Sequence, residues 1–153
     1  MFTGAAIGAL AGGAILGAVI AWRRGKPTKV PKGIDITPML PRNGAELLYV
    51  VPLVLNAGIS EEIFFRVYLP LLLVLAGVES WVAFAASVAI FGLLHRYQGW
   101  LGVLITTMLG AVFTLLYLGS GGLLLPILFH LLVNANALLV RPAFQLRFRR
   151  GSD

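Results

Sequence analysis

Most of the ionisable residues that fall inside apolar stretches of this chain are grouped into three short motifs. The motifs are Glu61-Glu62-Ile63-Phe64-Phe65-Arg66, Phe91–His95 and His130–Asn134. A charged side chain at bilayer depth costs at least a few kcal/mol, so such residues are functional candidates by default. Together the motifs supply a carboxylate base, a histidine and a His/Asn pair, which are the groups needed to activate water against a carbonyl.

On a helix, the charged residues of the first motif lie on two different faces. Glu62 and Arg66 are four residues apart and share one helix face, so their pairing lowers the cost of burying both charges. Glu61 is rotated by about 100° from Glu62 and faces a different neighbour. We therefore expect Glu62 and Arg66 to support the site, while Glu61 acts as the base. The alternative is an architectural ion pair between helices.

The other two motifs also place polar groups one helical turn apart. His130 and Asn134 share a face, and two side-chain donors converging in lipid can stabilise an oxyanion. They can equally form a hydrogen-bonded contact between helices. His95 follows Phe91 by one turn, which taken alone is weak evidence for a site.

These residues could also bind a metal ion. Two histidines and a glutamate can hold zinc, and the set would be Glu61, His95 and His130. The chain has no cysteine, no His-Glu-x-x-His, no Gly-x-Ser-x-Gly and no Walker loop. We favour chemistry without a cofactor, with zinc as the alternative.

The composition predicts an all-α membrane protein in which helices position these motifs. Of the 153 residues, 59% are hydrophobic and 12% charged, and the mean hydropathy is +0.92. Soluble domains carry about 25% charged residues. The net charge of +6 comes largely from basic residues on either side of the apolar core, as the positive-inside rule predicts, and does not indicate nucleic-acid binding. These residues are Arg23, Arg24, Lys26, Lys29, Lys32, Arg42, Arg141, Arg147, Arg149 and Arg150.

We expect about five transmembrane spans. They are residues 2–22, 45–77, 80–95, 100–118 and 123–140. The charge distribution then places the N-terminus outside and the C-terminus in the cytoplasm. Residues 1–44 form a first span and a basic, proline-rich cytoplasmic loop, residues 45–141 the core, and residues 142–153 a basic tail.

The second span is too long for one straight crossing. At ~1.5 Å per residue it reaches roughly 50 Å, against a hydrocarbon core of ~30 Å. Pro52, Asn56 and Gly58 precede Ser60, and they favour a kinked or re-entrant segment here. We expect a new helix capped by Ser60, with both glutamates in its first turn, where carboxylates are favoured.

The three motifs in this order resemble the CPBP family, the CAAX-protease and bacteriocin-processing group of intramembrane peptidases. Glu61-Glu62-x-x-x-Arg66 matches the family's Glu-Glu-x-x-x-Arg, Phe91–His95 its Phe-x-x-x-His, and His130–Asn134 its His-x-x-x-Asn/Asp. The resemblance covers roughly residues 45–140. It implies a four-helix catalytic core with a cavity that faces the cytosol.

The resemblance also implies roles for the motif residues. Glu61 with His95 would activate water, and His130 with Asn134 would stabilise the oxyanion. The family has been described both as metalloproteases and as glutamate-dependent proteases, and we favour the second. The expected substrate is a membrane-associated peptide or protein within the lipid bilayer, and the expected location is a prokaryotic plasma membrane. The alternatives are a small proton-coupled transporter and a non-catalytic immunity or scaffold protein.

Overall fold

The computed structural model describes residues 32–149, and within this range the chain forms helices and no strand. The expected all-α fold is therefore confirmed. The predicted first span, residues 2–22, lies outside the described residues, as does most of the basic loop. The elements in chain order are η1 (Thr37–Met39), α2 (Gly44–Ile63), η2 (Phe64–Tyr68), α3 (Leu69–Leu75), α4 (Ser80–Leu94), η3 (His95–Gln98), α5 (Trp100–Ser120), α6 (Leu124–Ala135), η4 (Asn136–Val140) and α7 (Arg141–Arg149).

Helix α2 begins at a reciprocal cap. The Asn43 side chain accepts a hydrogen bond from the Glu46 backbone N–H at 2.9 Å. The Glu46 carboxylate in turn accepts from the backbone N–H of Arg42 at 2.8 Å. Two backbone donors that a helix start leaves without partners are thus satisfied. This cap fixes where the long helix that carries Glu61 and Glu62 begins.

The predicted break before Ser60 is wrong. Helix α2 runs through Pro52 and continues into η2 and α3, so residues 44–75 form one uninterrupted helical segment. Ser60 does not cap a helix, because its hydroxyl donates to the carbonyl of Asn56 at 2.6 Å inside α2. In an apolar environment a helix keeps all its other backbone hydrogen bonds, so one proline does not end it.

Gly58 serves helix packing rather than a break. A Cβ atom at this position would lie 2.9 Å from the Cγ atom of Leu131 on α6. A side chain at position 58 would require the Leu131 side chain to move, so Gly58 favours the close approach of α2 and α6. The apolar core beside this contact consists of Val50, Val54 and Leu138, packed against η1 and α6.

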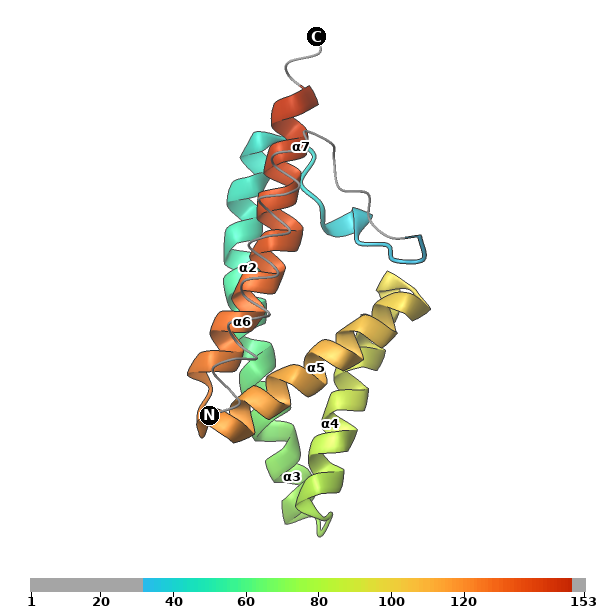
Figure 1. The fold of residues 1–153 in the computed structure, drawn as a ribbon, viewed down its shortest axis with the longest axis vertical. Helices are drawn as coiled ribbons and strands as arrows, with labels where there is room; N and C mark the ends of the chain where they lie inside the picture. Colours follow the sequence, from blue (N-terminus) through green and yellow to red (C-terminus); the bar gives the residue numbers. More distant parts are fainter. Residues whose placement is uncertain (1–31, 150–153) are drawn as a thin grey trace.

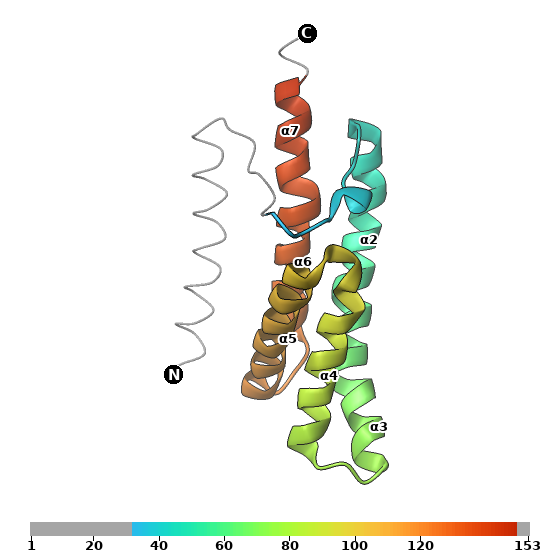
Figure 2. The ribbon, with the colours of Figure 1, turned by 90° about the vertical axis from the view of Figure 1, so that its right-hand side faces the viewer.

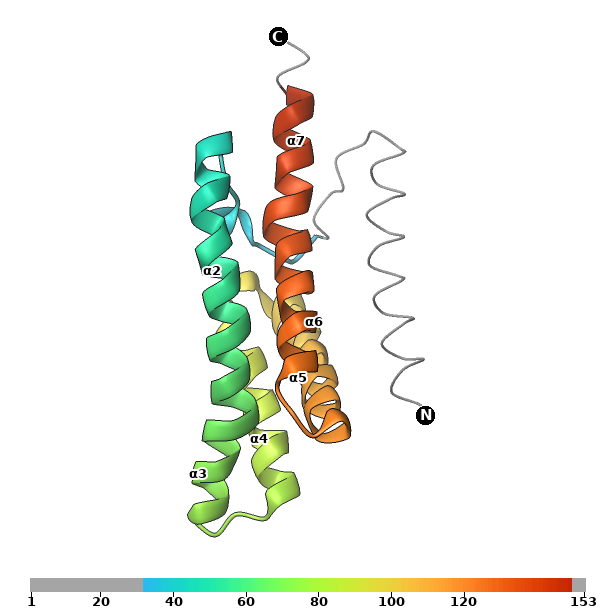
Figure 3. The ribbon, with the colours of Figure 1, turned by 90° about the vertical axis from the view of Figure 1, so that its left-hand side faces the viewer.

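The helices form two groups, and the three sequence motifs are divided between them. Helix α2 lies along α6 and α7, and α4 packs on α5 and α3 (Figure 1). Helix α5 crosses between the groups, from the η3 turn to the start of α6, as the view turned by 90° also shows (Figure 2). From the opposite side, α2 and the continuous α6–α7 helix run next to each other (Figure 3).

Three helical segments are long and apolar enough to cross a membrane. They are Gly44–Leu75, Trp100–Ser120 and Leu124–Arg147. Large apolar side chains such as Leu75 and Trp81 are exposed on the outside of the fold, where lipid is the favourable environment. The protein is therefore an integral membrane protein. Helix α4 has 15 residues, and the count of five spans remains a prediction.

Candidate active site

The site is built around an ion pair buried between helices. Arg66 donates from Nε to Glu62 Oε2 at 2.9 Å and from Nη2 to Glu62 Oε1 at 3.4 Å. Both side chains are fully buried. The Arg66 guanidinium also lies over the rings of Phe91 and Phe113, at 5.2 and 5.8 Å from their centroids. The predicted pairing of Glu62 with Arg66 is therefore confirmed.

His130 connects this ion pair to Glu61. Its Nδ1 atom lies 2.8 Å from Glu62 Oε1, and its Nε2 atom lies 3.8 Å from Glu61 Oε2. A carboxylate only accepts hydrogen bonds, so Nδ1 carries the proton that is shared with Glu62. The ring is stacked on Phe113, with centroids 5.0 Å apart. His130 is thereby held with Nε2 facing Glu61.

His95 is oriented by the backbone of its own motif. Its Nδ1 atom lies 2.7 Å from the carbonyl oxygen of Phe91. A carbonyl oxygen has no hydrogen to donate, which assigns the proton to Nδ1. In the neutral ring Nε2 then keeps its lone pair and can accept a proton. Any residue at position 91 would supply this carbonyl, whereas the Phe91 side chain itself contacts His95, with ring centroids 4.7 Å apart.

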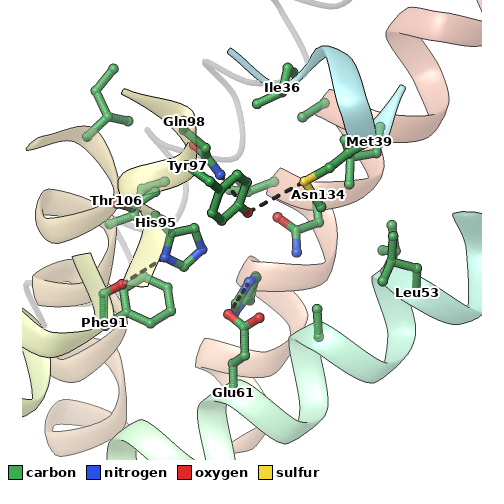
Figure 4. A pocket seen from close by; sticks show the side chains of 18 of the residues that line it. Ile36, Met39, Leu53, Glu61, Phe91, His95, Tyr97, Gln98, Thr106 and Asn134 are labelled. Atoms are coloured by element: carbon green, nitrogen blue, oxygen red, sulfur yellow. Dashed lines mark hydrogen bonds and ion pairs between the residues drawn. The ribbon is translucent and has the colours of Figure 1, made fainter. Parts of the chain in front are cut away.

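One pocket brings the predicted residues together. It has a volume of about 200 Å³, and Glu61, His95, His130 and Asn134 all line it. Figure 4 shows Glu61 pointing into the pocket from α2, His95 facing it from η3, and Asn134 on the opposite wall. Glu61 Oε2 has no hydrogen-bond partner among residues 32–149. Glu62 and Arg66 are fully buried and do not line the pocket, and their supporting role stays a prediction.

One π-helical turn overlaps the end of the Glu61–Arg66 motif, and another follows the His130–Asn134 motif. The turn Phe64–Tyr68 contains Arg66, and the turn Asn136–Val140 begins two residues after Asn134. Such turns are frequent at functional sites. At the first of them, the buried Ser87 hydroxyl on α4 donates to the carbonyl of Phe65 at 2.6 Å. Ser87 thereby fixes the segment from which Arg66 extends.

A close contact between α4 and α5 positions the segment that ends in His95. A Cβ atom on Gly92 would lie 2.9 Å from Thr107 Cβ and 3.1 Å from its Cα. The two helices therefore touch through backbone at this level. Gly110 on α5 is equally close to the ring of Phe91, since a Cβ there would lie 2.9 Å from Cδ1.

Sequence reasoning missed the contributions of α5 and of the η3 turn. Phe113 packs against Arg66 and His130, yet no polar neighbour in the sequence distinguishes it from other apolar residues. Tyr97 also lines the pocket. Its place two residues after His95 was the only available signal, and a weak one, because residues two apart in a helix do not share a face. The structure brings the two rings to 5.8 Å.

The donor set as arranged does not form a three-ligand metal site. Within residues 32–149, no group of three or more histidine, aspartate or glutamate side chains is close enough together to hold a metal ion. Glu61 and His130 face each other, whereas His95 stands apart from that pair.

The fold and site define an integral membrane protein of bundled helices with a pocket lined by a carboxylate, two imidazoles and an amide. A family model described as Type II CAAX prenyl endopeptidase Rce1-like matches residues 43–136. The chain belongs to this family, which confirms the resemblance to CAAX proteases and supports an intramembrane endopeptidase. No curated protein and no solved structure is similar enough to the chain to count as a match.

Proposed function

We propose that this protein hydrolyses a peptide bond of a membrane-associated substrate with water activated by Glu61 and His95. The observation that carries the proposal is the single pocket shared by Glu61, His95, His130 and Asn134, which come from three separate parts of the chain. Family membership supplies the reaction class, and the pocket supplies groups that suit it.

The first step is the attack of water on the scissile carbonyl. The Glu61 carboxylate, whose side chain is 32% exposed and lines the pocket, accepts a proton from water while the new C–O bond forms. The Nε2 lone pair of His95 accepts the other water hydrogen in a hydrogen bond and orients the nucleophile. General-base assistance of this kind raises the rate roughly 10²–10⁴-fold.

The second step is collapse of the tetrahedral intermediate. Its oxyanion is stabilised by the Asn134 amide, and by His130 Nε2 when the ring is protonated and Nδ1–H donates to Glu62. The C–N bond then breaks, and the proton held by Glu61 passes to the leaving amine. Glu62 and Arg66 keep His130 in the required orientation.

The walls of the pocket suit an apolar peptide segment. Much of its surface is formed by apolar side chains, which include Ile36, Leu53, Val54, Ile105, Leu109 and Val133. Such walls exclude water from around the reacting groups, which strengthens electrostatic stabilisation of the oxyanion. We infer that substrates enter from the bilayer with apolar side chains next to the scissile bond.

The test is cleavage of a membrane-tethered peptide library by the purified full-length protein in detergent. We expect Glu61→Gln, His95→Ala and Asn134→Ala each to lower kcat/KM by about 100-fold or more. Glu79→Gln is the matched control, because Glu79 is exposed and lies outside the pocket. Thermal unfolding of each variant distinguishes a loss of catalysis from a loss of folded protein. Wild-type cleavage rates in all three folded variants would refute the mechanism.

A further inference from the structure

The hydroxyl group of Tyr97 occupies a place in the pocket that the mechanism above does not use. Tyr97 lies on η3, two residues after His95, and its ring is 5.8 Å from the His95 ring. Figure 4 shows the Tyr97 hydroxyl on the same side of the pocket as Asn134, with Glu61 below both. Tyr97 thus borders the same pocket as Glu61 and Asn134.

The hydrogen bonds of this hydroxyl leave its own hydrogen in a weak contact. Gln98 Nε2 donates to the Tyr97 oxygen at 3.0 Å, so the hydroxyl hydrogen has to point elsewhere. It points to the thioether sulfur of Met39, at 3.5 Å. A thioether is a weak acceptor, and a peptide carbonyl is a much better one. The Tyr97 hydrogen is therefore available to a substrate at little loss.

The neighbours of Tyr97 hold this arrangement in place. The Gln98 side chain packs on Gly102, where a Cβ atom would collide with it. The Gln98 carbonyl accepts the backbone N–H of Asp35 at 3.0 Å, which ties the segment carrying Met39 to the same turn. Gln98 thus holds the oxygen of Tyr97 in place, and a substrate carbonyl has to replace only a weak contact between the Tyr97 hydroxyl and the Met39 sulfur.

We infer that Tyr97 is a substrate-positioning residue, whose hydroxyl donates a hydrogen bond to a backbone carbonyl of the peptide next to the scissile bond. The inference rests on the proposed peptidase function and extends it. By holding that carbonyl, Tyr97 aligns the scissile bond with Glu61 on one side and Asn134 on the other. A different role is an anchor at the membrane interface, where tyrosine is common and where the 55% exposure of Tyr97 would fit.

The experiment compares kcat and KM for the best-cleaved peptide of the library with wild-type, Tyr97→Phe and Tyr49→Phe proteins. Tyr49 is the matched control because it is exposed on α2 and does not line the pocket. A single neutral hydrogen bond corresponds to a loss of roughly 3-fold to 10-fold in kcat/KM. We expect this loss for Tyr97→Phe, with an unchanged thermal unfolding midpoint, and no loss for Tyr49→Phe.

A second measurement identifies the carbonyl. Backbone amides flanking the scissile bond are replaced one at a time by CH₂–NH, which removes the acceptor. At one position, this replacement in the substrate should lower the kcat/KM of the wild-type protein as much as Tyr97→Phe does. The replacement and Tyr97→Phe together should lower kcat/KM no further than either change alone. An interface anchor would not produce this non-additivity.

The outcomes separate the inference from the function on which it rests. Equal kcat/KM for wild type and Tyr97→Phe, or losses that add at every substrate position, would overturn the role of Tyr97 and leave the peptidase intact. A wild-type protein that cleaves no peptide of the library would overturn both.

Discussion

The Nδ1 atom of His130 lies 2.8 Å from Oε1 of Glu62, although 68 residues separate the two in the chain. The same carboxylate accepts from Arg66, so one buried glutamate orients both a guanidinium and an imidazole. The opposite edge of the His130 ring is thereby directed toward Glu61, at 3.8 Å. The two adjacent glutamates thus face the same histidine from different sides.

This relationship predicts that Glu62→Gln lowers the stability of the protein, and that any loss of cleavage follows from the loss of folded protein. The amide leaves the fully buried Arg66 without a charged partner, and breaking a buried pair costs about 3–5 kcal/mol. We expect a lower thermal unfolding midpoint and little folded protein, whereas Glu79→Gln at an exposed position should resemble wild type. A Glu62→Gln protein with normal unfolding and no cleavage would instead mean that Glu62 takes part in the reaction.

The Ser87 hydroxyl gives a second prediction. Ser87→Ala removes the donor to the Phe65 carbonyl and leaves that buried oxygen short of a partner, at a cost of about 1–3 kcal/mol. We expect a reduced unfolding midpoint, and also a lower kcat because the turn that carries Arg66 loosens. Ser80→Ala, at the exposed start of α4, is the control. Unchanged stability in Ser87→Ala would show that the π-helical turn does not depend on this hydrogen bond.

Gly92 tests the contact that positions the end of α4. Gly92→Ala places a methyl group against the side chain and the Cα atom of Thr107, so α4 and α5 have to separate. Overpacking of this kind costs typically about 1–3 kcal/mol, and His95 should move away from Glu61. We expect lower stability and a clear fall in kcat, measured beside Gly122→Ala, whose added methyl meets open space. Partial rescue by Thr107→Gly would identify the contact, while wild-type behaviour of Gly92→Ala would contradict it.

Metal removal gives a prediction that concerns the chemistry alone. We expect cleavage to be unchanged after dialysis against a zinc chelator, because Glu61, His95 and the His130–Asn134 pair supply a base and oxyanion donors without a metal. The measurement is kcat/KM before and after dialysis, and again after zinc is added back. Activity that disappears with the chelator and returns with zinc would replace the water-activation scheme by a metal-dependent one.

The sequence by itself determined the class of fold and identified the candidate residues Glu61, His95, His130 and Asn134, which line one pocket. Apolar runs interrupted by few charges predict membrane helices, since the cost of burying a charge in lipid restricts where charges occur. The same cost makes Glu61, Glu62, His95 and His130 conspicuous. The four-residue spacing of Glu62 and Arg66 predicts their ion pair directly, because helix geometry is local.

Only the tertiary structure decided how these parts meet. Pro52 and Gly58 suggested a broken helix, but Gly58 proved to be the contact point of α6, which a local pattern does not reveal. The pairing of His130 with Glu62, the stacking of Phe113 on His130 and the position of Tyr97 likewise depend on helices distant in the chain. Local spacing fixes what shares a helix face, whereas contacts between helices arise only when the whole bundle packs.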